Sequence, residues 1–266
     1  MEKEKKPFKK RMKWSENELI LAIRLYCQLP FGQLSSQNKK IIRLANVLGR
    51  TSSSVSMKLC NFASLDPDIV NSGRKGLQNA SNLDRKIWCE FHQDWEGLFL
   101  KSEEILKQYN LEIEDEEDDY SAGNRDVTTT ARIGQDFFRK MILVNYGKCA
   151  VCGIEHNSLL IASHILPWAN YPKDRLNPRN GLCLCALHDK AFDRNLLHIG
   201  GDYQIRIAEE MMQYKNKDWF AEYFGRYNAR LINLPEKFFP NREFLGERLN
   251  DGATVRVREG ILKPEG

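Results

Sequence analysis

Two pairs of sulfur and nitrogen donors lie in the middle of the chain. Two residues separate Cys149 from Cys152, and two separate Cys185 from His188. This separation allows one tight turn to present two ligand atoms to a tetrahedral ion, and Gly153 after the first pair permits that turn. The spacing therefore predicts a structural zinc ion held by the four side chains.

Two other residues leave the fourth zinc ligand open. His156 follows the first pair closely, and Cys183 stands just before the second pair. Either side chain could replace one of the four. The chain has seven cysteines in all, so a chance pair together with a buried thiol is the competing interpretation.

The residues around these pairs could hydrolyse a phosphodiester. His164 has an unperturbed pKa of about 6.5, so it can be neutral and accept the proton of an attacking water. A helix from about Leu187 would carry Asp189 and Asp193 on one face, because they are one turn apart. Two such carboxylates can bind Mg2+ or Mn2+, which would polarise the phosphate. The competing interpretations are a core histidine, an exposed Asp189, and an Asp193 that pairs with Arg194.

Residues 149–193 as a whole resemble the HNH (ββα-metal) endonucleases, in particular bacterial nucleases with a C-terminal HNH domain. Residues 162–168 resemble the strand that carries the catalytic histidine, and Asn180 resembles the middle residue of the family name. The resemblance implies that His164 is the general base. It also implies that Asn180 pins the loop before the second strand by hydrogen bonds.

The resemblance assigns the catalytic cation to Asp189 and Asp193. Many HNH enzymes carry Asp or His immediately before the catalytic histidine, where it binds this cation. The present chain has Ser163 at that position, which is a poor ligand. Some branches of the superfamily combine a small residue there with an Asp-x-x-x-Asp helix. Ser163 nevertheless favours an alternative, a catalytically inactive, zinc-stabilised DNA-binding regulator.

Basic residues near this segment suit a polyanionic substrate. Arginine matches phosphate well because its planar guanidinium group can donate two bonds. Residues 131–139 resemble the lead-in helix of bacterial HNH proteins. The residues expected to contact DNA here are Arg132, Arg139, Lys173, Arg175 and Arg179. For any single one of them, a solvated surface position is the competing interpretation.

Composition sets broad limits on the protein. Its 266 residues leave room for two domains, and a net charge of +4 is too small to show nucleic-acid binding. There is no apolar run of about 18 residues, so no membrane span is expected. The charged N-terminus lacks the apolar segment of a secretion signal, and the free cysteines suit a reducing compartment. These features predict a cytoplasmic protein.

The predicted fold class is α+β, with a helical N-terminal domain and a C-terminal zinc-stapled ββα-metal domain. Clusters of like charge mark the divisions, since residues 2–13 are strongly basic and residues 112–119 strongly acidic. The expected parts are a disordered basic arm at 1–13, a helical DNA-binding domain at 14–109, an acidic linker at 110–127, the HNH domain at 128–250 and a tail at 251–266.

The N-terminal domain shows clear helix boundaries. Ser15 and Glu18 form a capping box for a first helix that reaches about Cys27. Gly49 suits the end of a second helix, and Thr51 suits the start of a third. The sequence therefore predicts a group of short helices in this part of the chain.

Residues 42–55 resemble the turn and recognition helix of helix-turn-helix and Myb/SANT-like domains. This resemblance implies that Lys58 and Asn61 face a DNA groove. A protein-binding helical bundle is the alternative. A further helix at about 83–95 is expected to close the domain.

The segment after the proposed site extends the same domain. Residues 197–199 and 205–207 are predicted to form a β-hairpin around a Gly-Gly-Asp turn. Residues 234–245 resemble the tail that follows HNH cores in this branch.

These features together imply a metal-dependent HNH endonuclease that cuts double-stranded DNA, with structural Zn2+ and catalytic Mg2+ or Mn2+. A nuclease with its own DNA-reading domain is most often a restriction or phage-defence enzyme, which is an argument by family analogy. A homodimer would be needed for symmetric cleavage of both strands at one site. A nuclease that acts on RNA lacks an aromatic stacking motif to support it.

Overall fold

The computed structural model describes residues 13–109 and 130–249. The chain divides into two compact units, Met1–Asp118 and Asp119–Gly266. Nearly all of the predicted basic arm, and all of the predicted acidic linker and C-terminal tail, lie outside the described residues. No helix in the described part of the chain is long and apolar enough to cross a membrane.

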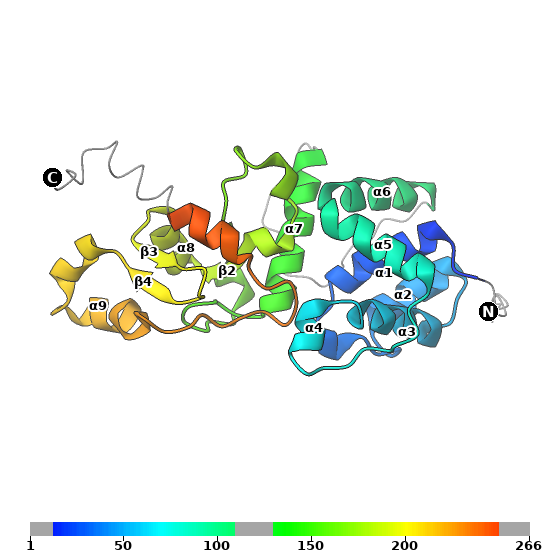
Figure 1. The fold of residues 1–266 in the computed structure, drawn as a ribbon, viewed down its shortest axis with the longest axis horizontal. Coiled ribbons are helices and arrows are strands. Elements are labelled where there is room, and N and C mark those ends of the chain that lie inside the picture. The colour runs from blue at the N-terminus through cyan, green and yellow to red at the C-terminus, as the bar shows by residue number, and fades with distance from the viewer. Residues whose placement is uncertain (1–12, 110–129, 250–266) are drawn as a thin grey trace, which may run out of the picture. The chain divides into compact units, whose positions relative to one another are not determined.

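All regular elements in the described part of the N-terminal unit are helices (Figure 1). Its elements are α1 (Glu16–Cys27), α2 (Lys39–Leu48), α3 (Ser52–Ala63), α4 (Pro67–Asn71), α5 (Asn82–Gln93) and α6 (Trp95–Gln108). The rings of Tyr26, Phe62 and Trp88 pack together between α1, α3 and α5, with the Phe62 and Trp88 centroids 6.2 Å apart.

The predicted boundaries of the first helices are confirmed. The capping box of Ser15 and Glu18 is present at the start of α1. Gly49 ends α2 with a φ of 61°, a left-handed conformation that glycine adopts without strain, and the Thr51 side chain accepts a hydrogen bond from the Ser54 N–H. Local capping chemistry therefore accounts for where these helices start and stop.

The single helix predicted at 83–95 is wrong in its extent. The chain breaks at Asp94, whose carboxylate accepts a hydrogen bond from the Gly97 N–H and so starts a second helix, α6. An aspartate before a helical run is an N-cap signal in the sequence. That signal predicts the observed division into α5 and α6.

The side chains of Lys58 and Asn61 do not face a groove. The Lys58 ammonium donates to both carboxylate oxygens of Asp84 at 2.9 Å, and the Asn61 amide donates to the Asn79 carbonyl at 3.4 Å. All three of Lys58, Asn61 and Asp84 are buried. The prediction that Lys58 and Asn61 contact DNA is therefore wrong, because this face of α3 packs against α5. The helix-turn-helix or Myb-like assignment stays a prediction.

The C-terminal unit is built on a strand pair and a helix. β1 (Leu160–His164) pairs antiparallel with β2 (Gly181–Cys185), with His164 opposite Gly181. α8 (Ala186–Asp193) follows β2 directly and packs against both strands. α7 (Thr130–Tyr146) also packs against both strands (Figure 1).

Close packing of α7 explains the glycine at the start of β2. A Cβ atom at Gly181 would lie 2.3 Å from Cδ1 of Ile142 and 2.8 Å from Cζ of Phe138. Any larger residue would force the Ile142 and Phe138 side chains of α7 to shift. Asn180 therefore supplies a polar side chain at the end of the loop, and Gly181 next to it leaves room for the α7 side chains.

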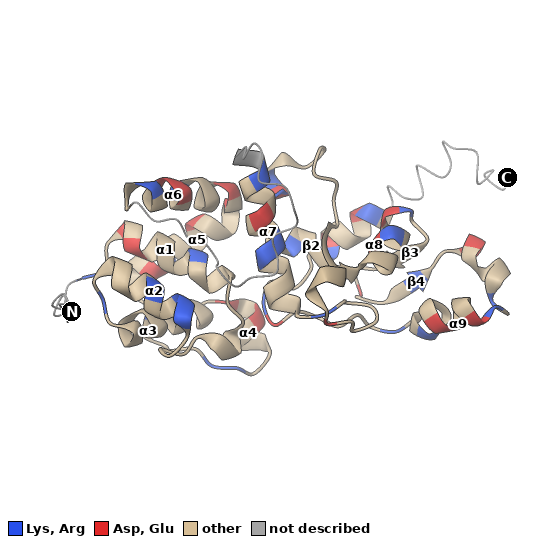
Figure 2. Ribbon diagram, turned by 180° about the vertical axis from the view of Figure 1, so that it is seen from behind, with Lys and Arg blue, Asp and Glu red and all other residues tan. Residues whose placement is uncertain are grey.

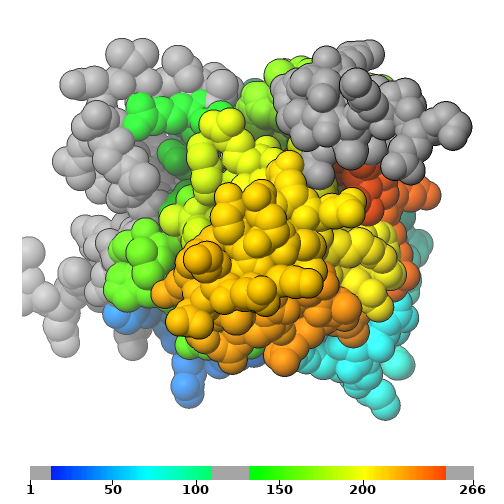
Figure 3. Space-filling model, turned by 90° about the vertical axis from the view of Figure 1, so that its left-hand side faces the viewer, coloured from blue at the N-terminus to red at the C-terminus, as the bar shows by residue number. Residues whose placement is uncertain are grey.

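The rest of the unit extends from α8. β3 (Leu197–Ile199) and β4 (Ile205–Ile207) pair antiparallel, which confirms the predicted hairpin. α9 (Asp218–Tyr223) follows, and residues 242–249 form a last helix. Figure 3 shows the end of the unit at which β3, β4 and α9 lie, in yellow and orange.

Candidate functional site

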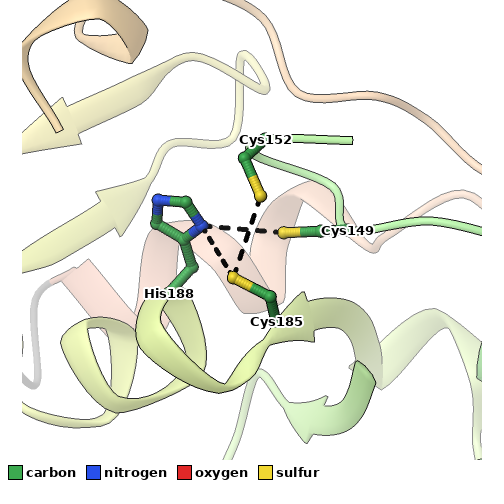
Figure 4. Close-up of side chains that lie close together, drawn as sticks. All are labelled: Cys149, Cys152, Cys185 and His188. Carbon is green, nitrogen blue, oxygen red and sulfur yellow. Dashed lines mark hydrogen bonds between the residues drawn. The ribbon is translucent and has the colours of Figure 1, made fainter. Parts of the chain in front are cut away.

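Cys149, Cys152, Cys185 and His188 converge on one point (Figure 4). Their four donor atoms all lie within 4.8 Å of one another. The Sγ atoms of Cys152 and Cys185 are 3.8 Å apart, and Nδ1 of His188 is 3.1 Å from Sγ of Cys185. Zinc–sulfur bonds of about 2.3 Å in a tetrahedron place two sulfurs roughly 3.8 Å apart. The four side chains thus fit a zinc ion in size and in ligand type.

Backbone hydrogen bonds shape the turn that carries the first two ligands. The Cys149 N–H donates to the Ile154 carbonyl at 2.8 Å, and the Gly153 N–H donates to the Cys149 carbonyl at 3.0 Å. Gly153 has a φ of 77°, which a side chain would strain. The knuckle that the sequence predicts is therefore present, and β2 and α8 supply the second pair of ligands.

The His188 ring is oriented by a bond on its far side. Its Nε2 lies 2.9 Å from the Tyr223 carbonyl, which can only accept, so Nε2 carries the proton. This tautomer leaves the lone pair of Nδ1 directed at the sulfurs. Second-shell bonds of this kind fix the tautomer of metal-binding histidines.

The cluster favours a positive charge at its centre. Burial lowers the pKa of His188, but hydrogen bonds with the Cys149 and Cys185 sulfurs raise it to about 10 overall. Hydrogen bonds from Cys152 and Cys185 lower the pKa of Cys149 and so favour its thiolate. Zinc binds thiolates and neutral imidazole, and would supply the positive charge that protonated His188 otherwise supplies.

Neither alternative ligand belongs to this cluster. His156 is exposed, and Cys183 is buried on β2 opposite Ala162. Burial raises the pKa of the Cys183 thiol, which opposes metal binding by that sulfur. The structure brings together the four side chains that the spacing predicts.

His164 lies at the end of β1 in a half-buried position. Its Nε2 is 2.9 Å from the Arg175 carbonyl, which can only accept, so the neutral ring has its lone pair on Nδ1. The ring stacks on Phe138 with the centroids 4.0 Å apart, and Trp168 meets it edge-on. Burial lowers the pKa of His164, and the bond to Arg175 offsets this only in part. Its surroundings thus favour the neutral form of His164, with Nδ1 as the unprotonated nitrogen.

Asn180 is completely buried between β1 and β2. Its Oδ1 accepts a hydrogen bond from the Leu166 N–H at 2.8 Å, and its Nδ2 donates to the Asp174 carbonyl at 3.0 Å. It also donates to the Leu166 carbonyl at 3.3 Å. These bonds connect the start and the middle of the loop that follows His164 to one side chain at its end.

The two aspartates of α8 have different surroundings. The Asp189 carboxylate accepts a short hydrogen bond from the buried Ser163 hydroxyl, and burial raises the pKa of Asp189. Asp193 is exposed, and its carboxylate lies 3.9 Å from the guanidinium group of Arg248 rather than beside Arg194. Ser163 and His164 are adjacent on β1, so their side chains leave opposite faces of the strand, toward α8 and α7 respectively.

This oxygen cluster is much less complete than the sulfur cluster. Within residues 13–109 and 130–249, the zinc cluster is the one group of three or more Cys, His, Asp or Glu donors close enough to share an ion. Mg2+ is usually bound through one or two carboxylates, with water and substrate phosphate filling its other positions. Asp189 and Asp193 fit a cation held in that way.

The basic residues around β1 differ in how tightly they are held. Lys173 is exposed in the loop before β2. The Arg175 guanidinium donates to the Trp168 carbonyl at 2.8 Å, and that of Arg179 donates to the Phe239 carbonyl at 3.3 Å. Arg132 and Arg139 are half-buried on α7, along which Figure 2 shows Lys and Arg in blue.

Arg248 is a neighbour of the site that the sequence analysis did not identify. It comes from the last described helix and reaches the ends of both β1 and α8. No local motif marks it, because its partners lie 56 and 83 positions earlier in the chain.

Comparison with known proteins supports the assignment made from these residues. Residues 149–200 match the family model described as HNH endonuclease. The C-terminal unit therefore contains an HNH domain. The matched segment includes the four zinc-type ligands, His164, Asn180 and both aspartates of α8, and it ends before Arg248. No curated protein matches the chain.

Proposed function

We propose that the chain is a metal-dependent HNH endonuclease that hydrolyses phosphodiester bonds of double-stranded DNA, with His164 as general base. The observation that carries this proposal is the bond from His164 Nε2 to the Arg175 carbonyl. It leaves Nδ1 as the basic atom, and burial keeps the ring neutral. A base in this state can accept a proton at physiological pH.

In the proposed reaction His164 Nδ1 takes a proton from a water molecule as that water attacks phosphorus. The bond from phosphorus to the 3′ oxygen breaks and that oxygen takes a proton from solvent, which yields a 5′ phosphate and a 3′ hydroxyl. Asn180 holds the loop between β1 and β2, so that the Arg175 carbonyl keeps its hydrogen bond with His164 Nε2. Asp189 and Asp193 would hold Mg2+ or Mn2+, which would polarise the phosphate and stabilise the leaving oxygen.

The structural zinc ion would be held by Cys149, Cys152, Cys185 and His188. Its proposed role is to fix β2 and the first turn of α8 against the knuckle at 149–153. We further propose Lys173, Arg175, Arg179, Arg132 and Arg139 as the residues that contact DNA phosphates. A restriction or phage-defence role, and a dimer for cutting both strands, are proposed by analogy with HNH nucleases.

The experiment is conversion of supercoiled plasmid by the full chain with Mg2+, Mn2+ or EDTA. His164→Ala and Asp189→Ala are compared with His156→Ala, which changes an exposed histidine outside the cluster. Metal-dependent nicking that the first two variants lose and the third keeps is the expected result. Cleavage that survives His164→Ala would show that another group is the base.

A second candidate is a zinc-stabilised DNA-binding regulator without catalytic activity. The hydrogen bond from Ser163 to Asp189 favours it, because the serine occupies the position of a common metal ligand and binds an aspartate that the cation would use. Tight DNA binding without cleavage of modified or unmodified plasmid, under any of the metal conditions, would support the regulator.

A further inference from the structure

The guanidinium group of Arg248 is held at the meeting point of two elements. Its Nη1 donates to the Ile165 carbonyl at 2.8 Å, and its Nη2 donates to the Phe192 carbonyl at 2.9 Å. Ile165 directly follows His164, and Phe192 directly precedes Asp193. One side chain therefore bonds to the backbone next to the proposed base and next to a proposed metal ligand.

Further contacts fix the same group. The guanidinium carbon lies 3.8 Å from the centre of the Phe192 ring, and the side chain is only 15 % exposed. A cation at the last turn of α8 also interacts favourably with the C-terminal end of that helix. Arg248 is thus a largely enclosed side chain with several partners, unlike an exposed surface arginine.

Its charge faces the carboxylates of α8. The nearest oxygen of Asp193 is 3.9 Å from Nη2, and the charges of Asp189 and Arg248 also influence each other. Two carboxylates one helical turn apart repel each other, and a fixed cation beside them reduces this repulsion. Arg248 can therefore stabilise the proposed metal site before a divalent cation binds.

We propose that Arg248 is a positioning residue of the nuclease site, whose guanidinium group clamps the end of the His164 strand to the end of the helix that carries Asp189 and Asp193. This inference rests on the proposed function. It extends the site to residues 242–249, beyond the segment that matches the HNH family model. Arg248 is assigned no contact with substrate, because its side chain is largely enclosed and its guanidinium group is held by two backbone carbonyls.

The test uses the full chain with Arg248→Gln and Arg248→Lys. Arg206→Gln is the matched control, since Arg206 forms an exposed ion pair with Asp202 in the same unit. Zinc content measured by elemental analysis shows whether each variant is folded around its zinc site. Arg248→Lys keeps the charge and the alkyl chain, so it tests the inference even where the glutamine variant does not fold.

Both Arg248 variants are expected to lower kcat for plasmid nicking by about 10- to 100-fold, with KM for DNA changed by less than about threefold. Lysine should not rescue activity, because one ammonium group cannot replace a planar fork that reaches two carbonyls. A normal kcat in Arg248→Lys would show that charge alone matters, and would overturn the proposal that Arg248 joins β1 to α8. A raised KM with unchanged kcat would assign Arg248 to the substrate instead.

Amide hydrogen exchange without DNA provides a readout that does not depend on cleavage. The clamp predicts faster exchange at 163–166 and 190–194 in both Arg248 variants than in Arg206→Gln. Unchanged exchange in these segments would overturn the clamp even if the enzyme is active. An inactive wild-type chain would instead refute the proposed nuclease function, while exchange would still decide whether Arg248 clamps β1 to α8.

Discussion

The two faces of α8 differ in how completely the protein surrounds an ion. On one face His188 joins three cysteines, so four protein ligands converge and no position is left for substrate. On the other face Asp189 and Asp193 offer hard oxygen atoms, and Ser163 adds only a hydroxyl. Closed tetrahedral sites of Cys and His are structural, whereas catalytic sites keep open positions. One short helix thus combines a site suited to stability with a site suited to chemistry.

The difference also appears in what supports each face. The His188 ring is oriented by the Tyr223 carbonyl, 35 positions later in the chain. On the opposite face Arg248 lies 3.9 Å from Asp193 and donates to the Phe192 carbonyl, 56 positions earlier in the chain. A backbone carbonyl thus orients a ligand on the zinc face, whereas a cation stands beside the carboxylates on the aspartate face, and both supports come from later segments of the chain.

Loss of the zinc face should have the largest effect. Cys185→Ser removes one of four ligands, and structural zinc contributes about 10–16 kcal/mol of apparent binding free energy in small zinc domains. We expect loss of bound zinc and of the cooperative unfolding of the C-terminal unit, measured by elemental analysis and circular dichroism. Cys89→Ser changes an exposed cysteine of the other unit and is the control. Stoichiometric zinc in Cys185→Ser would contradict the assigned ligand set.

Damage to the aspartate face should affect catalysis alone. Asp189→Asn keeps the shape of the side chain but removes its charge, so the Mn2+ concentration for half-maximal cleavage should rise at least about 10-fold. Zinc content should stay at the wild-type value. Asp218→Asn, at the exposed start of α9, is the matched control. Loss of zinc in Asp189→Asn would show that the two faces are not separable.

The pH dependence of cleavage can separate His164 from Asp189. Burial lowers the pKa of His164 below 6.5, so its neutral form persists to lower pH than in an unfolded chain. Cleavage should therefore be full above pH 6.5 and fall about tenfold per pH unit below a midpoint that lies under 6.5. A midpoint above 6.5 would exclude a buried, neutral His164 as the base.

The metal concentration identifies which group causes the fall in cleavage at low pH, the acidic limb of the pH profile. Protons and Mn2+ compete for the Asp189 carboxylate, so a limb due to Asp189 shifts to lower pH as Mn2+ is raised. A limb due to His164 does not shift, because no metal is assigned to its ring. Cleavage rates over the pH range at two Mn2+ concentrations therefore distinguish the two groups.

The smallest expected effect concerns DNA contacts. Lys173→Gln should weaken DNA binding to all sequences equally and reduce the slope of log affinity against log salt by about 1. Lys215→Gln is the control, since Lys215 is an exposed lysine of the same unit in the segment just before α9. Equal effects of the two changes would mean that Lys173 has no special part in DNA binding.

Short-range spacing made much of the site predictable. The two ligand pairs lie within single turns, and a turn places such residues together in almost any fold that forms it. The caps at Ser15, Gly49 and Thr51 were predictable for the same reason, because a cap involves only neighbouring residues. Asn180 was identified only through the family resemblance, since its hydrogen bonds depend on the shape of the loop.

Long-range packing accounts for what the sequence did not reveal. Lys58 and Asn61 were expected to face DNA because α3 resembles a recognition helix, but α5 brings Asp84 against the same face. A helix in a bundle has more than one polar residue on its surface, and its neighbours decide which of them are covered. Arg248 was missed because its two acceptors are backbone carbonyls of distant elements.

The sequence by itself determined the zinc-type ligands, the limits of the first helices, the second hairpin and the resemblance to HNH endonucleases. Each of these depends on residues within a turn or a strand pair. Only the tertiary structure decided that Nε2 of His164 is bonded to the Arg175 carbonyl, that Ser163 bonds to Asp189, and that Arg248 joins β1 to α8. Those contacts depend on how separate segments pack, and packing is a property of the whole folded unit rather than of any short pattern.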